Sequence, residues 1–325
     1  MKGIYSSTAL LLALSISAFS QAKEPFSPMD LFKIAYAANP VVSPNGHVIA
    51  FDRVYMDVMT DSRRSDLWVI DKDGNNLRQI SQDFDVVGPP VFTPAGDALA
   101  FVAVKDEQFN IFSQNLATGD RAKLGEDLAG PANLSFSPDG KWLAFTMPVA
   151  YEPDTMGDIP MAPEGAKWAS PLVVETRHMY TLDGAGYLPF SSHQVFLIST
   201  QGGVAQQLTE GRKDYASTLT WLPDSSALLF SANIKSDVNK PLDTDIIRLD
   251  IETRELTPLT KQLGPDWTPQ ISPDGKRMAW IGNKYRRIEI QSQQLYTSGL
   301  DGSDTREWEI DGDFSISDFA WHPDG

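Results

Sequence analysis

A four-residue turn motif recurs six times in this chain of 325 residues, and its spacing constrains the fold more than any other feature. Every copy has Pro at its second position, usually after Ser or Thr and usually followed by Asp or Asn and then Gly. The copies lie at 43–46, 93–96, 137–140, 222–225, 272–275 and 322–325. They begin 50, 44, 85, 50 and 50 residues apart. Self-similarity at this period indicates a repeat architecture with one structural unit per repeat.

The motif is typical of a type I turn between two short strands. Pro presets φ, the Asp or Asn side chain bonds the local backbone, and Gly tolerates the conformation in which the turn ends. An apolar residue precedes each of the first five copies, and an aromatic residue follows five positions after the last residue of each. These aromatic residues are Phe51, Phe101, Phe145, Phe230 and Trp280. Each turn is therefore expected to join two apolar strands.

Further strand signals follow within every unit. Apolar runs bounded by Gly, Asp or Thr are typical of strands in hairpins. They span 66–70, 109–116, 195–198, 246–249 and 295–296. Four short strands about every 45 residues are typical of β-propeller blades. The sequence therefore predicts an all-β fold, a β-propeller of four-stranded blades, with about five blades and the start of a sixth in this chain. The longest stretch with a helical pattern is 29–38, where Asp30 is a candidate helix cap.

The repeat also predicts how the chain is organised. We expect residues 23–40 to form a lead-in segment and residues 41–325 to form the propeller. The 85-residue interval contains either one blade with an insertion or two blades, one of which has lost its turn motif. A stretch at about 148–171 is rich in Pro, Met, Gly and acidic residues and has no strand pattern, which favours the insertion. The last motif opens a sixth unit and would leave the ring incomplete, so we expect a longer polypeptide.

Residues 1–22 have the organisation of a secretory signal peptide. Lys2 forms a short basic region, and residues 9–19 form an apolar core that is too short to span a bilayer. Ser20-Gln21-Ala22 places small residues at positions −3 and −1 of a cleavage site. The chain has no Cys, so it uses neither disulfides nor thiolate metal ligands. We expect a periplasmic or secreted protein with no membrane association after signal cleavage.

Few residues are arranged for catalysis. The chain has no Gly-x-Ser-x-Gly motif, and we expect no catalytic residue within it. Its four histidines lack metal-ligand spacing, so we expect neither a metal site nor a cofactor. They are His47, His178, His193 and His322. Residues 71–75 resemble the start of a calcium loop, but the later Gly and Glu are missing and a hairpin turn is due there. A formal net charge of −16 argues against nucleic acid as a partner.

One stretch after the expected insertion is more polar than a scaffold strand requires. Within residues 173–187, Glu175, Arg177 and His178 lie close together in sequence, with two tyrosines nearby. On an extended strand, Glu175 and Arg177 would share a face. Two interpretations are open: a solvent-facing ion pair across strands, or a polar patch at a channel or cleft that binds substrate.

Several of these motifs together resemble the N-terminal propeller of the prolyl oligopeptidase family, in particular its exported acylaminoacyl-peptidase and dipeptidyl-peptidase-like branch. The resemblance covers about residues 26–325. The residues that carry it are the six turn motifs, Met29-Asp30-Leu31-Phe32, Gln207-Leu208-Thr209 and Asp183-Gly184-Ala185-Gly186-Tyr187. It implies about seven blades in the intact protein, capping an α/β-hydrolase domain that carries a Ser-Asp-His triad. That domain would begin beyond residue 325, so no catalytic residue is carried over to this chain.

Two functions follow as hypotheses. In the first, the chain is the substrate-gating propeller of an exported serine peptidase, with oligopeptide substrates and the C-terminal hydrolase domain of the same polypeptide as partners. Glu175 or Arg177 would then hold a peptide terminus by a charge-assisted hydrogen bond. In the second, it is a non-catalytic periplasmic propeller that binds a protein partner, like the Tol-system propeller. The expected insertion favours the first, since a docking propeller needs no lid-like element.

Overall fold

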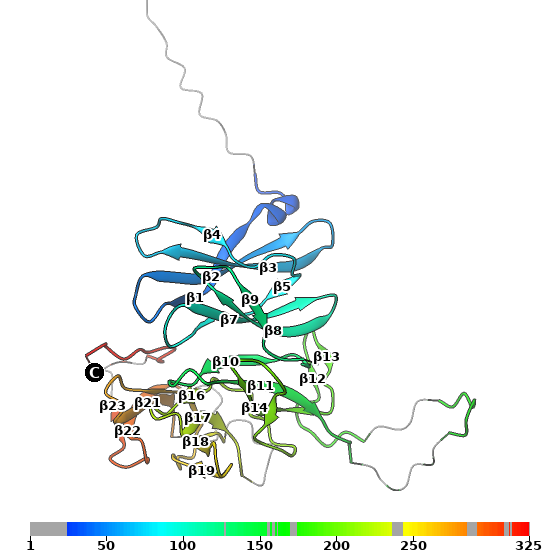
Figure 1. Cartoon of the computed structure of the whole chain (residues 1–325). Helices are drawn as coiled ribbons and strands as arrows, with labels where there is room; N and C mark the ends of the chain where they lie inside the picture. The colour runs from blue at the N-terminus through cyan, green and yellow to red at the C-terminus, as the bar shows by residue number, and fades with distance from the viewer. Residues whose placement is uncertain are drawn as a thin grey trace, which may run out of the picture.

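The computed structural model describes residues 25–126, 128–154, 157, 160, 162–169, 174–235, 243–284, 291–308, 312 and 314–324. The expected signal peptide and part of the expected insertion lie outside these residues. The described chain forms five antiparallel sheets of four or five strands, which stack face to face in chain order, and one separate two-stranded sheet (Figure 1). Within four of the five larger sheets the strand order follows the chain, and each of these five is one blade of a β-propeller. The predicted all-β propeller fold is confirmed.

The first two blades differ in their innermost strand. Blade 1 contains β1 (Ala35–Val42), β2 (Val48–Asp57), β3 (Ser62–Asp71) and β4 (Arg78–Gln79). Blade 2 contains β5 (Val86–Val87), β6 (Val91–Phe92), β7 (Ala98–Lys105), β8 (Gln108–Asn115) and β9 (Arg121–Lys123). Both β5 and β6 pair with β7. The strand is divided because Pro89 and Pro90 have no backbone N–H to donate to the ladder.

The other three blades repeat the pattern. Blade 3 contains β10 (Ala132–Phe136), β11 (Trp142–Ala150), β14 (Ser191–Ser199) and β15 (Gln206–Gln207). Blade 4 contains β16 (Thr220–Trp221), β17 (Ala227–Ala232), β18 (Asp245–Asp250) and β19 (Leu256–Pro258). Blade 5 contains β20 (Asp266–Ile271), β21 (Arg277–Gly282), β22 (Gln294–Gly299) and β23 (Arg306–Trp308). Since β11 pairs directly with β14, the 85-residue interval contains one blade with an excursion, residues 151–190. Residues 148–150, assigned to the insertion from sequence, lie in β11.

The lead-in segment differs from its expected form. Residues 28–33 form a short 3-10 helix, η1 (Pro28–Lys33), and the chain becomes extended at Ala35. The helix that the pattern of 29–38 indicated therefore ends at Lys33. The expected boundary between the lead-in segment and the propeller, at residue 41, lies inside β1. Asp30 does contribute to the N-terminal cap, because its carboxylate accepts a hydrogen bond from the Ser27 backbone N–H at 2.8 Å.

The turn motifs have the predicted geometry. In the first copy, Gly46 N–H donates to the Ser43 carbonyl at 2.8 Å, and Gly46 has φ of 73°. The Ser43 hydroxyl donates to Asn45 Oδ1 at 2.7 Å and accepts from the Val48 N–H at 2.9 Å. The serine therefore joins the turn to the start of the next strand. Residues 71–76 also form a turn, in which Gly74 N–H donates to the Asp71 carbonyl and the Asn76 amide donates to the Asp71 carboxylate.

The repeated aromatic residues hold neighbouring blades together. Phe101, Phe145, Phe230 and Trp280 are fully buried. Phe101 packs in the core between blades 1 and 2, whereas Ala100 and Val102 pack in the core between blades 2 and 3. Alternate residues of one strand therefore serve two different interfaces, as the period of a β-strand requires. Phe51 differs from its counterparts because it is only partly buried in blade 1.

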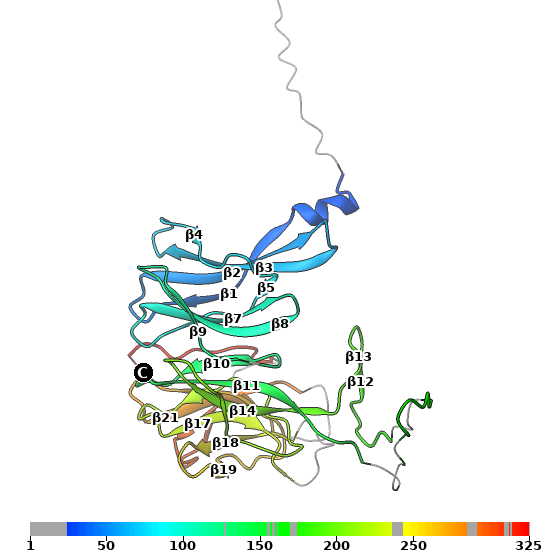
Figure 2. The same cartoon turned by 45° about the vertical axis from the view of Figure 1, so that its right-hand side comes forward.

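The two ends of the blades are unlike. One end, which we call the turn face, carries the turn motifs and the connections to each outermost strand, all of five or six residues. The other end, which we call the loop face, is where η1 leads into β1. The connections there range from two residues, 106–107, to the 40 residues of 151–190. Figure 2 shows η1 and the excursion on the same side of the stack. Variable connections on a regular scaffold are where binding residues are usually found.

Candidate functional site

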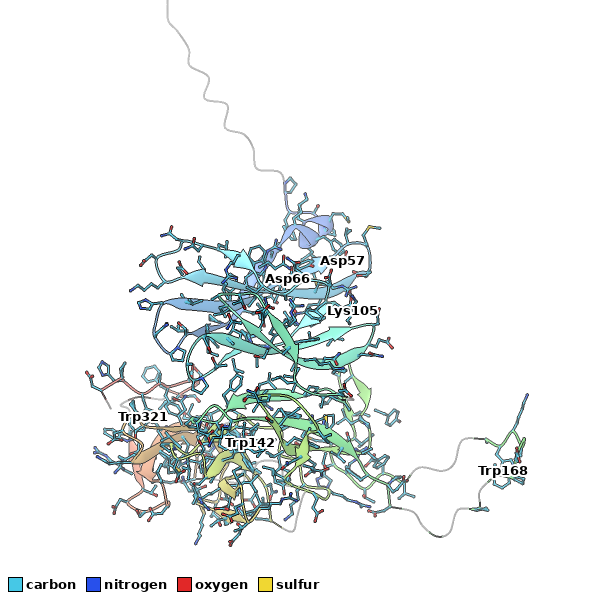
Figure 3. All side chains as sticks on the ribbon, in the orientation of Figure 1. Asp57, Asp66, Lys105, Trp142, Trp168 and Trp321 are labelled. Carbon is cyan, nitrogen blue, oxygen red and sulfur yellow. The ribbon has the colours of Figure 1, made fainter. Side chains whose placement is uncertain are left out.

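The excursion of blade 3 is the largest feature of the loop face, and it contains both predicted site residues. It leaves the end of β11 and returns at β14 (Figure 1). Its second half carries a hairpin of β12 (Thr181–Leu182) and β13 (Gly186–Tyr187), which forms a sheet of its own. Figure 3 shows Trp168 far out on the excursion, away from the blades.

Glu175 and Arg177 form a close ion pair. Arg177 Nε and Nη2 donate to the two carboxylate oxygens of Glu175 at 2.8 and 2.7 Å, and the Arg177 backbone N–H donates to Oε1 at 2.8 Å. The hydrogen bonds from Arg177 lower the pKa of Glu175 to about 2. Neither residue lies in a strand, so the interpretation as an ion pair across strands is wrong. The pair forms within one irregular segment and does not bridge two strands.

Arg177 also closes the base of the hairpin. Its Nη1 donates to the Pro189 carbonyl at 2.8 Å, and its Nη2 donates to the Leu188 carbonyl at 3.1 Å. The guanidinium carbon lies 4.1 Å from the centre of the Phe190 ring, in a cation–π contact. Arg177 therefore fixes the segment before the hairpin to the segment after it.

A second arginine holds the other end of the excursion. Arg212 donates to Asp154 Oδ1 at 2.8 Å and to the Glu152 carbonyl at 2.8 Å, and it lies over the Tyr151 ring at 5.1 Å. The rings of Tyr151 and Phe190 meet edge to face at 6.1 Å. Arg177, Phe190, Tyr151 and Arg212 thus form a row across the base of the excursion, with a cation at each end.

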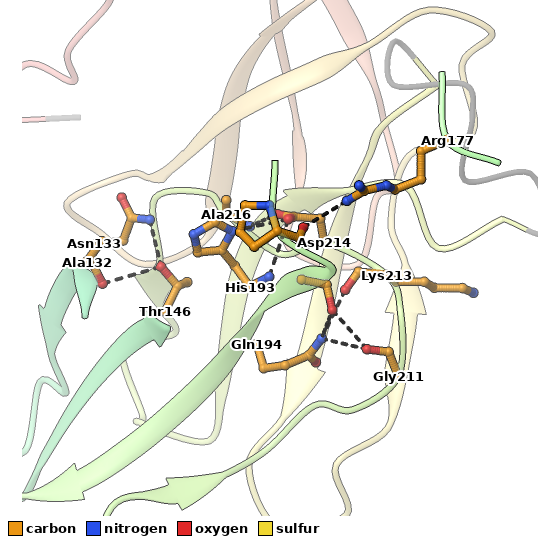
Figure 4. A network of polar contacts seen from close by, with 12 residues as sticks. Ala132, Asn133, Thr146, Arg177, His193, Gln194, Gly211, Lys213, Asp214 and Ala216 are labelled. Carbon is orange, nitrogen blue, oxygen red and sulfur yellow. Dashed lines mark hydrogen bonds and ion pairs between the residues drawn. The ribbon is translucent and has the colours of Figure 1, made fainter. Parts of the chain in front are cut away.

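The loop that carries Arg212 is joined tightly to β14 (Figure 4). The Gln194 amide donates to the carbonyls of Gly211 and Lys213, both at 3.1 Å, and Gln194 is fully buried. His193 Nδ1 lies 3.1 Å from Asp214 Oδ2, and this hydrogen bond raises the pKa of His193. These hydrogen bonds fix the loop of residues 211–214, and with it Arg212 and Asp214, to the loop-face half of β14.

These partners were not predicted from sequence. Arg212 and Asp214 lie outside the turn repeat and contact residues 58 and 21 positions away. Ser192, the serine beside His193, donates its hydroxyl to the Gly211 carbonyl at 2.9 Å. The hydroxyl is thus committed to a structural bond and not to a nucleophile–base pair. In the described ranges, no three His, Asp or Glu side chains are grouped as metal ligands would be.

A second polar cluster lies at the loop-face end of blades 4 and 5. Lys235 Nζ contacts Asp243 Oδ1 at 2.6 Å and Asp245 Oδ2 at 2.9 Å. Asp266, at the start of β20, is fully buried and accepts a hydrogen bond from Trp280 Nε1 at 2.9 Å. Burial raises the pKa of Asp266 to about 7.

Among the residues described, no helix is both long and apolar enough to cross a membrane.

Comparison with known proteins shows which proteins are similar to this chain. No family model matches the chain. It is 21% identical over 325 residues to dipeptidyl-peptidase 5 of Porphyromonas gingivalis, covering 96% of this chain and 47% of that protein. It is 26% identical over 223 residues to the uncharacterized peptidase YuxL of Bacillus subtilis, covering 67% and 33% of the two chains. Acylaminoacyl peptidase of Pyrococcus horikoshii superimposes with a TM-score of 0.63 at 15% identity, over 85% of this chain and 39% of that one.

The chain matches the propeller portion of a prolyl oligopeptidase-family peptidase. It spans less than half the length of these two curated relatives. A TolB structure from Agrobacterium tumefaciens also superimposes, with a TM-score of 0.54 at 13% identity, over 84% of this chain and 80% of that one. At this identity the likeness shows a shared propeller fold alone.

Proposed function

We propose that this chain is the substrate-gating propeller of an exported serine peptidase that hydrolyses oligopeptides. The observation that carries the proposal is the contrast between the two faces. The turn face has short connections throughout, whereas the loop face carries a 40-residue excursion anchored at both ends by arginine. The two peptidase relatives, which extend well beyond the matched region, support a catalytic domain in the same polypeptide.

The proposed division of labour leaves the chemistry to that second domain. Its serine would attack the peptide carbonyl with a histidine as base and form an acyl-enzyme. The propeller would restrict access, so that an unfolded peptide enters and a folded protein does not. The excursion is suited to this role because its base is fixed by Arg177 and Arg212 while its outer part extends away from the blades.

Glu175 and Arg177 stay the proposed peptide-contacting residues. Both side chains are partly exposed, at 23% and 20%. Each already has its partner, so a peptide ammonium would share the Glu175 carboxylate with Arg177 and would not meet a free charge. We therefore expect a charge-assisted contact whose loss weakens peptide binding, seen as an increase in KM, while the chemical step is retained.

The first test is whether the intact polypeptide is a serine hydrolase. The gene is sequenced beyond codon 325, and the full product is treated with a fluorophosphonate probe. Labelling of a serine in a downstream Gly-x-Ser-x-Gly motif is the expected result. A reading frame that ends soon after the ring closes, with no labelling, would contradict the proposal and favour a propeller that binds a protein partner. Export is tested by fractionation and by N-terminal sequencing of the mature protein, which should begin at Lys23.

The gating role needs a separate test. Deleting residues 155–173 from the full-length protein retains Asp154, Glu175 and both arginine anchors, so the base of the excursion is preserved. We expect kcat/KM for long peptides to rise relative to short ones. The matched control is Val204→Ser, which changes an exposed residue on the turn face. Unchanged discrimination between short and long peptides in the deletion variant would remove the gating role.

A further inference from the structure

We propose that the hairpin of residues 179–188 docks onto the catalytic domain of the same polypeptide and holds that domain over the loop face. The inference rests on the proposed function, because it requires that a catalytic domain is present. It adds the surface through which the propeller holds that domain, which neither the fold nor the relatives assign.

Exposed apolar side chains are concentrated on the loop face. In the hairpin, the exposed fractions are 52% for Met179, 41% for Tyr180, 46% for Leu182 and 82% for Tyr187. A second group lies at η1 and the β2–β3 connection of blade 1, and consists of Phe26, Met29, Leu31, Val58 and Met59. The large apolar residues exposed on the turn face, such as Leu77 and Val204, are isolated from one another in sequence. Isolated exposed apolar residues are ordinary, whereas a group on one face indicates an interaction site.

The hairpin is presented in a defined conformation. A two-stranded hairpin alone is marginally stable in water, and β12 and β13 pair only with each other. Its ends are nonetheless joined, because Leu188 N–H donates to the Tyr180 carbonyl at 2.8 Å and Arg177 binds the Leu188 and Pro189 carbonyls. The Tyr180 and Tyr187 rings lie 6.1 Å apart on the same hairpin. An apolar surface that is ordered before binding loses less entropy when a partner covers it.

The chemistry of the hairpin identifies the kind of partner. Asp183 is its only charged residue among ten, in a chain in which 22% of residues are charged. Interface cores are depleted in charge and enriched in Tyr and Met, whereas rims exposed to water are not. The hairpin therefore fits a stable, largely apolar protein surface better than a transient, charged peptide terminus.

The relatives and the path of the chain favour the catalytic domain as that surface. The matched region is 47% of the dipeptidyl-peptidase and 39% of the acylaminoacyl peptidase, so more than half of each lies outside it. The described chain also leads into the propeller on the loop face, through η1 and β1. A domain of that size, covalently attached, has a high effective concentration at the propeller.

Site-specific photo-crosslinking of the full-length polypeptide tests the proposal. Tyr187 is replaced with p-benzoylphenylalanine, irradiated, and the crosslinked peptides are identified by mass spectrometry. The matched control places the same residue at Val204, which is 90% exposed on the opposite face. We expect an intramolecular crosslink from position 187 to a peptide beyond residue 325, and none from position 204.

Each other outcome overturns the proposal. A crosslinked species of twice the mass would assign the hairpin to contact between two copies of the chain. Absence of a crosslink at position 187, or equal yields at both positions, would show that the hairpin is not covered. Fluorophosphonate labelling of the same sample reports the peptidase function separately, so failure of the docking proposal can be distinguished from failure of the proposed function.

Discussion

The Asp266→Asn variant gives the sharpest test of the electrostatics, because the Asp266 carboxyl is buried in the interior where blades 4 and 5 meet. Asp266 is completely buried, and its backbone carbonyl accepts hydrogen bonds from Ser231 and Thr244 of blade 4. Its Oδ1 accepts from Trp280 Nε1 at 2.9 Å and from Gln262 Nε2 at 3.3 Å, and its Oδ2 has no hydrogen-bond partner among the described residues. Burial raises the pKa to about 7, against the smaller opposing effect of hydrogen bonds from Thr260 and Trp280.

The sign of the pH dependence follows from linkage. The folded state holds the Asp266 proton up to about pH 7, whereas the unfolded chain releases it near pH 3.8. Between these values the unfolded state is favoured as pH rises, by about 1.36 kcal/mol per pH unit. From pH 5 to pH 7 this amounts to a loss of about 2 kcal/mol of stability, because the folded group is itself half-ionised at pH 7. The nearby charged groups act in opposite directions, since Asp245 raises the pKa of Asp266 and Lys235 lowers it.

Asn at position 266 can accept the same hydrogen bond from Trp280 but cannot ionise. Urea unfolding at pH 5 and pH 7 should therefore show a smaller decrease for Asp266→Asn than for the wild type, with the variant the more stable at pH 7. Asp274→Asn is the matched control, because Asp274 lies on the turn face and its hydrogen bonds lower its pKa. The stability that the Asp274 carboxylate contributes is lost only when the pH falls below the range of pH 5 to pH 7. Equal pH dependence in wild type and Asp266→Asn would refute the assignment of the proton to this carboxyl.

Three further predictions concern the site and the core. Arg177→Ala should increase chymotrypsin cleavage within 179–188 by about tenfold, since it removes the hydrogen bonds to the Leu188 and Pro189 carbonyls, together worth about 1.5 kcal/mol, while the blades remain resistant; an unchanged rate would show that Arg177 does not stabilise the hairpin. Asp214→Asn should lower the pKa of His193 in an NMR titration. That ion pair stabilises the fold below the raised pKa and is lost as pH rises through it, by less than about 1 kcal/mol because it is exposed. Leu228→Ala, in the fully buried core between blades 3 and 4, should lower the free energy of unfolding by about 2–5 kcal/mol in urea titrations.

The blades could be predicted from the sequence because the signals that define them are local. A Ser-Pro-Asp-Gly turn needs only its own residues, as the bonds between Ser137, Asp139 and the following strand show. The aromatic residue five positions later was visible as well, although only the structure shows that Phe145 packs against blade 2. The extent of β1 was not visible, because Ala35 to Ala38 carry no strong apolar pattern and become extended only by pairing with β2.

The candidate site was only half predicted, for a reason that is also physical. Glu175 and Arg177 could be predicted as a pair because they are neighbouring charges. Their geometry could not, because it depends on residues 188–190, which fold back to contact Arg177. Arg212 was missed altogether. It is an ordinary surface arginine in sequence, and its partners at 152–154 become neighbours only after blade 3 has formed.

If the propeller has the proposed gating role, the division between repeated and unrepeated residues assigns its selectivity to the excursion. Residues that recur at the repeat period fill the interfaces between blades or close the turns of the turn face. Their side chains are therefore buried or hydrogen-bonded within the propeller. Arg177, Arg212 and Tyr187 occupy no repeated position, and all three lie on the excursion or at its base. A change there can alter what reaches or contacts the loop face without disturbing the inter-blade cores, since the excursion leaves after β11 and returns at β14 with that strand pairing intact. Relatives with different peptide preferences should therefore differ most in this excursion and least in the turn motifs.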